Sequence, residues 1–137
     1  MKKIIALTLV FLVFFSLVTF AASEIKVTLN GKNIKFDVAP EIIDGRTMVP
    51  LRAIFEAMGA EIEWDGDTQT VAAIKDETVV VAFIGEKVIY INDEDVEIDV
   101  PPMIKDGRTL VPVRFITEAF GYNVKWNDKT RTVAITD

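Results

Sequence analysis

The side chains that could do chemistry in this chain are carboxylates, because the groups on which most catalytic sites depend are missing. The sequence contains no histidine and no cysteine. A structural zinc site, a copper site and a cysteine–histidine nucleophile are therefore excluded, and a serine nucleophile would lack its imidazole base. There is no glycine-rich phosphate-binding loop either. The sequence thus predicts a protein that is not an enzyme and that holds no cofactor.

Paired carboxylates are the catalytic arrangement that remains, because glycoside hydrolysis needs two of them, one with a pKa raised by burial. The candidate pairs are Asp37 with Asp99 and Asp65 with Asp67, together with the run Asp93-Glu94-Asp95. Carboxylate oxygens also suit calcium, for which Asp65 with Asp67 and Asp93 with Asp95 are the candidates. Nearly all of these residues lie in predicted turns or on exposed strand faces. The sequence therefore favours solvated surface roles for them.

Four larger side chains are candidates for contact with a ligand. Arg46 and Arg108 each follow an Asp-Gly turn, and a guanidinium can grip carboxylates or phosphates through two hydrogen bonds. The alternative, which we favour, is that each arginine locks its own turn to a nearby carboxylate or to backbone carbonyls. Trp64 and Trp126 could stack on sugars. Each shares a strand face with an apolar neighbour, however, so we expect both indoles to lie in the core.

These four residues occupy matching places in two copies of one pattern. Residues 25–75 align with residues 87–137 without a gap, and 21 of the 51 aligned positions are identical. Each copy carries Asp-Gly-Arg-Thr-x-Val-Pro-x-Arg, then a glycine, and a tryptophan at the fifth position after that glycine. The sequence therefore predicts two tandem copies of one structural unit.

Each copy predicts a β-hairpin, a short helix and a second hairpin. Alternating residues around Asn30-Gly31 predict a hairpin over residues 25–38, and its counterpart has strands at 88–91 and 96–100. Apolar residues at helical spacing predict a helix that starts at Pro50 and ends at Gly59, with Pro112 and Gly121 as the matching limits. The second hairpins are expected at residues 60–74 and 122–136.

The predicted fold class is α+β, with mainly antiparallel sheets packed on the two short helices. Helices of this length are not stable alone and must bury their apolar stripes against the sheets. Residues 78–84 form a nearly continuous apolar run between the copies. This run predicts a connecting strand that is buried on both faces.

Residues 1–23 have the layout of a secretory signal. Lys2 and Lys3 precede the apolar run of residues 4–20, and small residues follow at positions 21–23. We expect cleavage near residues 21–23, which leaves a domain of residues 24–137 that is secreted or held in the cell envelope. The alternative is an uncleaved segment that anchors the protein in the membrane.

The charge of the remaining chain argues against nucleic acid as a partner. Without Lys2 and Lys3, 13 basic residues stand against 21 acidic ones. A protein this acidic repels a phosphate backbone.

The run Gly-Arg-Thr-x-Val-Pro-x-Arg, followed by Glu-Ala-x-Gly and the tryptophan, resembles the copper amine oxidase N-terminal-like domain, also called the stalk domain. The resemblance covers residues 25–137. It implies an exported bacterial α+β module that often accompanies larger envelope or secreted enzymes. Copper and the modified tyrosine of those oxidases belong to a separate catalytic domain, and Tyr90 is followed by Ile91-Asn92 rather than by that tyrosine's motif. The resemblance therefore carries over no catalytic residue.

Two functions fit these observations. The first is a noncatalytic envelope module that acts through protein–protein contacts, with an envelope protein or a second copy of itself as partner. The alternative is a module that binds cell-wall glycan or another polysaccharide, which Trp64 and Trp126 would contact.

Overall fold

The computed structural model describes residues 24–137, and the predicted signal segment of residues 1–23 lies outside them. The described region has two short helices, α2 (Leu51–Ala57) and α3 (Val113–Ala119). Within residues 24–137 no helix is long and apolar enough to span a membrane. The strands are β1 (Lys26–Leu29), β2 (Lys32–Asn33), β3 (Glu41–Ile43), β4 (Arg46–Pro50), β5 (Glu61–Asp65), β6 (Thr70–Lys75), β7 (Thr78–Phe83), β8 (Val88–Ile91), β9 (Glu94–Glu97), β10 (Met103–Lys105), β11 (Arg108–Pro112), β12 (Asn123–Asn127) and β13 (Thr132–Thr136).

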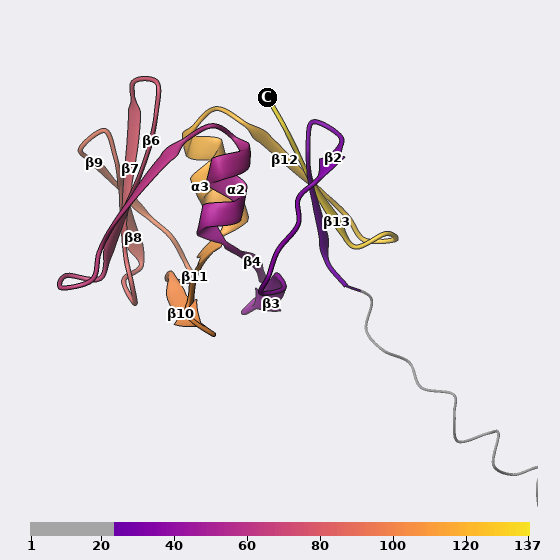
Figure 1. The fold of residues 1–137 in the computed structure, drawn as a ribbon, viewed down its shortest axis with the longest axis horizontal. Helices are drawn as coiled ribbons and strands as arrows, with labels where there is room; N and C mark the ends of the chain where they lie inside the picture. The colour runs from indigo at the N-terminus through magenta and orange to yellow at the C-terminus, as the bar shows by residue number, and fades with distance from the viewer. Residues whose placement is uncertain (1–23) are drawn as a thin grey trace, which may run out of the picture.

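The strands form three sheets around the two helices (Figure 1). Sheet A has the order β12-β13-β1-β2, sheet B has the order β10-β11-β4-β3, and sheet C has the order β5-β6-β7-β8-β9. The helices lie side by side between sheets A and C, with sheet B at one end of them. Every strand pair in the described region is antiparallel except β1 with β13. The predicted α+β class with mainly antiparallel sheets is confirmed.

Strands from both halves of the chain, residues 25–75 and 87–137, mix in all three sheets. Sheet A joins β1 and β2 of the first half to β12 and β13 of the second, and sheet B pairs β4 with β11. Sheet C joins β5 and β6 to β8 and β9 through the connecting strand β7. The prediction of two tandem units is therefore not confirmed. A two-stranded hairpin is too small to be stable alone, and here the hairpins gain partners from the other half.

The predicted hairpin turns are present, but the strands that follow them are shorter than expected. Asn30 and Gly31 have φ values of 48° and 85°, and Asn92 and Asp93 have 49° and 71°, as the expected type I′ turn requires. The returning strand β2 has only two residues, and β9 ends at Glu97 instead of reaching residue 100. Beyond these strands the chain leaves the outer sheet and runs toward sheet B.

The two helices begin one residue later than predicted. Pro50 and Pro112 are the N-caps, with extended ψ values of 120° and 116°, and neither helix has a side-chain cap. The predicted apolar stripe of α2 is confirmed, because every member is at most 6% exposed: Leu51, Ile54, Phe55 and Met58. In α3 the buried hydroxyl of Thr117 donates to the carbonyl of Val113 at 2.7 Å, which satisfies it inside the core.

Both predicted glycine caps are confirmed. Gly59 and Gly121 have φ values of 82° and 86°. The amide of Gly59 donates to the carbonyl of Glu56 at 3.0 Å, and that of Ala60 donates to the carbonyl of Phe55 at 2.8 Å. This is the Schellman arrangement, which satisfies carbonyls left open at a helix end.

The main core surrounds the helices and takes buried residues from all three sheets. Phe55 of α2 meets Phe120, just after α3, edge to face with ring centroids 5.5 Å apart. The prediction that β7 is buried on both faces is wrong: Val80 and Ala82 are 2% exposed, whereas Val79 is 37% exposed. One face of sheet C packs on the core, and no described helix covers the other face.

We expect Gly59→Val and Gly121→Val each to lower the free energy of unfolding by about 1–2 kcal/mol, because a branched residue resists positive φ. A Cβ atom at either position would meet no other atom within 4 Å, so the effect is one of backbone conformation alone. Urea unfolding measures it. Gly66→Ala, at a glycine whose φ is not positive, is the control, and equal stability of all three variants would contradict the assignment of the caps.

Candidate ligand-binding grooves

The four candidate side chains come together in two grooves, as crossed pairs. Trp64 lies with Arg108 in one groove of about 710 Å³, the Trp64 groove. Trp126 lies with Arg46 in another of about 300 Å³, the Trp126 groove. The first is lined by Lys35, Phe36, Asp37, Pro50, Leu51, Arg52, Ala53, Glu56, Ile62, Trp64, Val71, Ile104, Gly107, Arg108 and Thr109. The second is lined by Ile42, Gly45, Arg46, Thr47, Pro112, Val113, Arg114, Val124, Trp126, Asp128, Arg131 and Val133.

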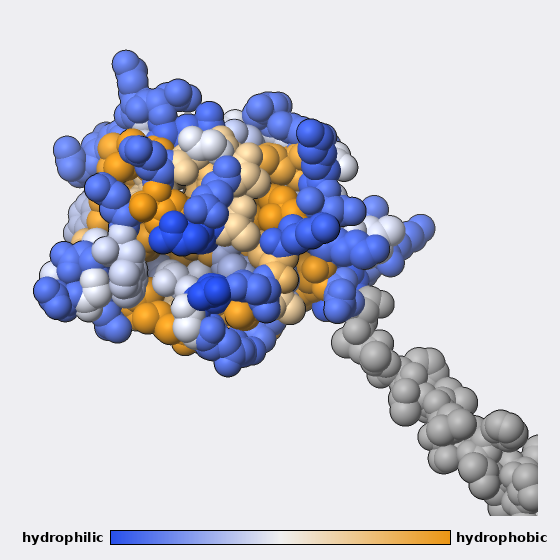
Figure 2. Space-filling model, in the orientation of Figure 1, coloured by the Kyte–Doolittle hydropathy of each residue, from blue (hydrophilic) through white to orange (hydrophobic). Residues whose placement is uncertain are grey.

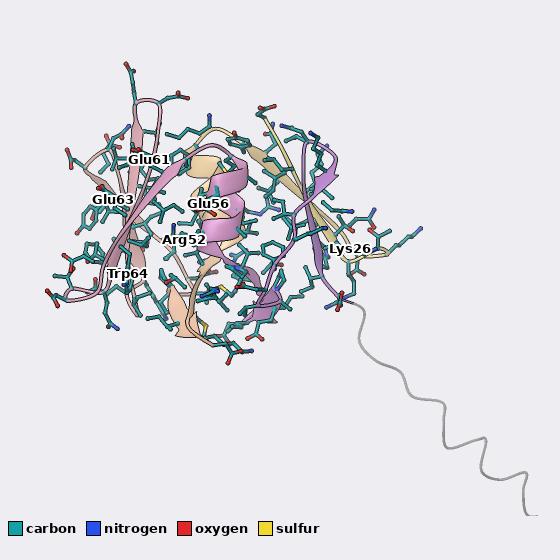
Figure 3. All side chains as sticks on the ribbon, in the orientation of Figure 1. Lys26, Arg52, Glu56, Glu61, Glu63 and Trp64 are labelled. Atoms are coloured by element: carbon teal, nitrogen blue, oxygen red, sulfur yellow. The ribbon has the colours of Figure 1, made fainter. Side chains whose placement is uncertain are left out.

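Each groove is built from both halves of the chain because the strands are exchanged. The Trp64 groove takes its tryptophan from β5 and its helix from α2, but its arginine from β11. On the face shown in Figure 3, Arg52 and Glu56 of α2 lie beside Trp64 of β5. Apolar surface is visible between the charged side chains of α2 and sheet C on the same face (Figure 2).

The two arginines bind carboxylates of the opposite half. The Nε atom of Arg46 donates to both oxygens of Asp99, at 3.0 and 2.9 Å, and its Nη2 donates to Oδ2 at 2.7 Å. Arg108 grips Asp37 in the same way, with an Nε–Oδ2 distance of 2.9 Å. The favoured prediction, that each arginine ties its turn to a nearby carboxylate, agrees with these contacts. The partners lie 53 and 71 residues away and reach the arginines only through the strand exchange.

These contacts change the acidity of both carboxyl groups. The hydrogen bond from Arg108 is the largest cause that holds the pKa of Asp37 below its ordinary value, and Arg46 does the same for the pKa of Asp99. A general acid needs a raised pKa, and these two are lowered. Asp37 and Asp99 therefore act as ion-pair partners of arginine and do not form the carboxylate pair considered from the sequence.

Each helix carries one i,i+4 ion pair. Arg52 lies 3.5 Å from Glu56, and Arg114 lies 3.3 Å from Glu118. All four side chains are at least 42% exposed, so each pair contributes little to stability. Arg52 and Glu56 line the Trp64 groove, and Arg114 lines the Trp126 groove.

The prediction that both tryptophans lie in the core is wrong. Trp64 is 43% exposed and Trp126 is 36% exposed. Each lies opposite a buried valine, Val71 or Val133, so the predicted strand face is correct. However, β5 and β12 are the edge strands of their sheets, which leaves the indoles open on one flank. Both indoles therefore belong to the groove walls.

The structure adds Ile42 and Ile104, which the sequence reasoning did not single out. They are 45% and 43% exposed, and each lines the groove that holds the arginine of its own hairpin. Each isoleucine is the middle residue of a three-residue strand, so its side chain points to the opposite face from those of its neighbours.

Among the other acidic candidates, Asp65 has a local structural role. The Oδ1 atom of Asp65 accepts the amide of Asp67 at 3.0 Å and that of Thr68 at 3.4 Å, which shapes the turn after β5. Among residues 24–137 no cluster of three metal-ligating side chains occurs.

Because Trp64 is nearly half exposed, we expect Trp64→Ala to reduce the free energy of unfolding by only about 1–2 kcal/mol. Phe55→Ala, which empties a fully buried site, should reduce it by about 3–5 kcal/mol. Chemical unfolding of both variants tests this, and an equal loss would place Trp64 in the core.

We expect the pair of arginine–carboxylate contacts to stabilise the fold only above acid pH. A lowered folded-state pKa gives stability that is present above the ordinary carboxyl pKa of 3.8 and is lost as pH falls through the folded value. The double variant Asp37→Asn/Asp99→Asn should therefore melt below the wild type at neutral pH, and the difference should shrink below pH 3.8. Glu63→Gln is the control, and a difference in melting temperature that stays constant with pH would contradict the assignment.

The sequence is similar to those of known proteins. The sequence profile of the copper amine oxidase N-terminal domain family matches residues 28–135. The chain is similar to a primary amine oxidase of Klebsiella aerogenes, with 33% identity over 73 residues that cover 53% of this chain and 10% of that protein. It is also similar to a protease inhibitor of Brevibacillus choshinensis, with 27% identity over 114 residues that cover 80% of this chain and 34% of that protein.

The chain thus spans about a tenth and about a third of the length of these two relatives. The family match itself covers nearly the whole described fold, from β1 to β13. The chain therefore belongs to the copper amine oxidase N-terminal domain family, a family of non-catalytic accessory domains.

Proposed function

We propose that this protein is a noncatalytic module of the cell envelope that binds a partner protein through the Trp64 groove. The observation that carries the proposal is the exposure of Trp64 and Ile104, both 43% exposed, in one groove of about 710 Å³. Large aromatic side chains in a concave site are the usual anchors of protein–protein contacts. The volume lies within the range of ordinary binding pockets.

The rim of the groove supports a polar, specific contact around this apolar centre. The pairs Arg108–Asp37 and Arg52–Glu56 flank the groove and hold charged groups at fixed places. An apolar centre with a charged, hydrated rim is the usual anatomy of a protein interface.

The comparisons agree with a contact role. The family is one of non-catalytic accessory domains, and one relative is named a protease inhibitor, which implies contact with another protein. The sequence lacks histidine and cysteine, and both arginine-bound carboxyl groups have lowered pKa values. We therefore infer that the chain itself is not an enzyme.

The two halves of the chain are, in this proposal, copies of one ancestral unit. Strands and helices recur in the same order at aligned positions, from β3 and β10 through α2 and α3 to β5 and β12. The two grooves are lined largely by residues that this alignment pairs with each other. The copies exchanged strands and became one domain.

Export is the second part of the proposal, because a cell-envelope module must leave the cytoplasm. We expect the protein recovered from the envelope or the medium to begin near residues 21–23, with the signal segment removed. Intact-mass spectrometry of the recovered protein measures this. A mass that retains Met1, in a membrane fraction, would instead favour the anchored form.

Cell-wall glycan is the second candidate ligand, because the exposed indole of Trp64 lies beside the polar side chains of Arg52 and Glu56. Sugars stack on such rings while their hydroxyl groups bind neighbouring polar groups. Saturable sedimentation with purified cell-wall sacculi, lost in Trp64→Ala and kept in Trp126→Ala, would favour this reading over the protein partner.

The test of the protein partner is cross-linking in the producing cell from a photoreactive residue placed at Ala53, which lines the groove. The control carries the same residue at Lys125, on the outward face of β12. We expect a protein adduct from position 53 that is lost when Trp64→Ala and Ile104→Ala are added. An adduct that persists in this variant, or that forms equally from position 125, would contradict the proposal.

A further inference from the structure

The two grooves differ in what fills them. In the Trp126 groove the guanidinium of Arg131 lies over the indole of Trp126, 5.9 Å from the ring centre. The indole Nε1–H donates to Asp128 at 3.4 Å. A cation over the face of a tryptophan is an attractive contact. The face of the Trp126 indole is therefore in contact with a basic side chain of the same chain.

The arginine of the Trp126 groove makes a second contact of the same kind. The guanidinium of Arg46, held by Asp99, lies 5.3 Å from the ring centre of Phe115 on α3. The planar face of an arginine packs well on an aromatic ring. Both the arginine and the tryptophan of this groove are thus stacked against residues of the same chain.

At the matching positions of the first half, the chain has smaller or uncharged residues. Ala53 stands in place of Phe115, Gly66 in place of Asp128 and Gln69 in place of Arg131. Among residues 24–137 no cation stacks on Trp64 and no ring stacks on Arg108. Of these three residues, Ala53 lines the Trp64 groove, whose volume of about 710 Å³ exceeds the volume of about 300 Å³ of the Trp126 groove.

The charged residues around the two tryptophans also differ. Glu63, Asp65 and Asp67 line the hollow on the other side of Trp64. Around Trp126 the matching residues are Lys125, Asn127 and Lys129. From that side, the three carboxylates favour a positive charge beside Trp64. Within the Trp64 groove, Arg108 and Arg52 are paired with Asp37 and Glu56, and Lys35 is a further cation of the lining.

We propose that the Trp64 groove binds a segment of a partner protein that places a basic side chain over Trp64 and an aromatic side chain against Arg108. The ligand thus supplies from outside the equivalents of two contacts within the chain, that of Arg131 with Trp126 and that of Phe115 with Arg46. This inference rests on the proposed protein-binding function and names the chemistry of the segment that binds.

Nuclear magnetic resonance can test the basic contact, because the chain has two tryptophans and gives one indole N–H signal for each. The probes are acetylated, amidated peptides Phe-(Gly)n-Arg with one to four glycines, and the same peptides with citrulline in place of arginine. We expect the arginine peptides to shift the Trp64 signal, to leave that of Trp126 unchanged, and to bind about two- to fivefold more tightly than the citrulline peptides.

Exchanging residues between the grooves provides matched variants. Ala53→Phe with Gln69→Arg should fill the Trp64 groove and abolish the shift of the Trp64 signal. Phe115→Ala with Arg131→Gln should open the Trp126 groove, so that the Trp126 signal also responds. Gln69 has a φ of 52°, as does Arg131, so either residue fits either turn. Arg131→Gln alone, which leaves Phe115 in the core, covers the case in which the double variant does not fold.

Equal binding of arginine and citrulline peptides by the wild type would overturn the proposal, and so would an unchanged response of the filled variant. The proposed function is tested by a separate experiment, the cross-linking from position 53. If cross-linking from position 53 captures a partner that depends on Trp64 while the arginine peptides do not bind, the groove binds protein but not through this chemistry. If neither occurs, both statements fail.

Discussion

The pairing of β4 with β11 is the constraint on which the rest of the structure depends. Val49 lies opposite Val111, and Met48 lies opposite Pro112, all buried. Each strand continues through its proline directly into a helix. The register of this one pair therefore places both helices, and their apolar stripes in turn fix the two outer sheets. Its two faces also serve two cores, since Val49 and Val111 join the large cluster and Met48 joins the small one.

The exchange of strands around this pair creates both grooves. An arginine from one half reaches a carboxylate and a tryptophan of the other half, and neither groove exists within a single half. The two grooves differ in their contacts. Arg131 stacks on Trp126 in one of them, and within residues 24–137 no cation stacks on Trp64 in the other. Under the proposal above, the first groove is part of the structure and the second takes a ligand.

The corrections to the sequence reasoning have a common cause. Trp64 and Val79 belong to apolar patterns that are typical of buried residues, yet both are more than a third exposed. Apolar residues at every second position identify one face of a strand. They do not tell whether the strand is at an edge or whether another layer covers that face. Those facts depend on which strands become neighbours. The short strand β2 has the same explanation, because residues beyond it are drawn toward Arg108.

The sequence by itself determined the local structure: the turns at Asn30-Gly31 and Asn92-Asp93, the caps at Gly59 and Gly121, and the buried stripe of α2. These features depend on the conformational limits of a few adjacent residues, which are written in the sequence. Only the tertiary structure decided that Arg46 meets Asp99 and that Arg131 stacks on Trp126. Such contacts join residues far apart in the chain, and they form only because shared sheets bury more apolar surface than two separate units could.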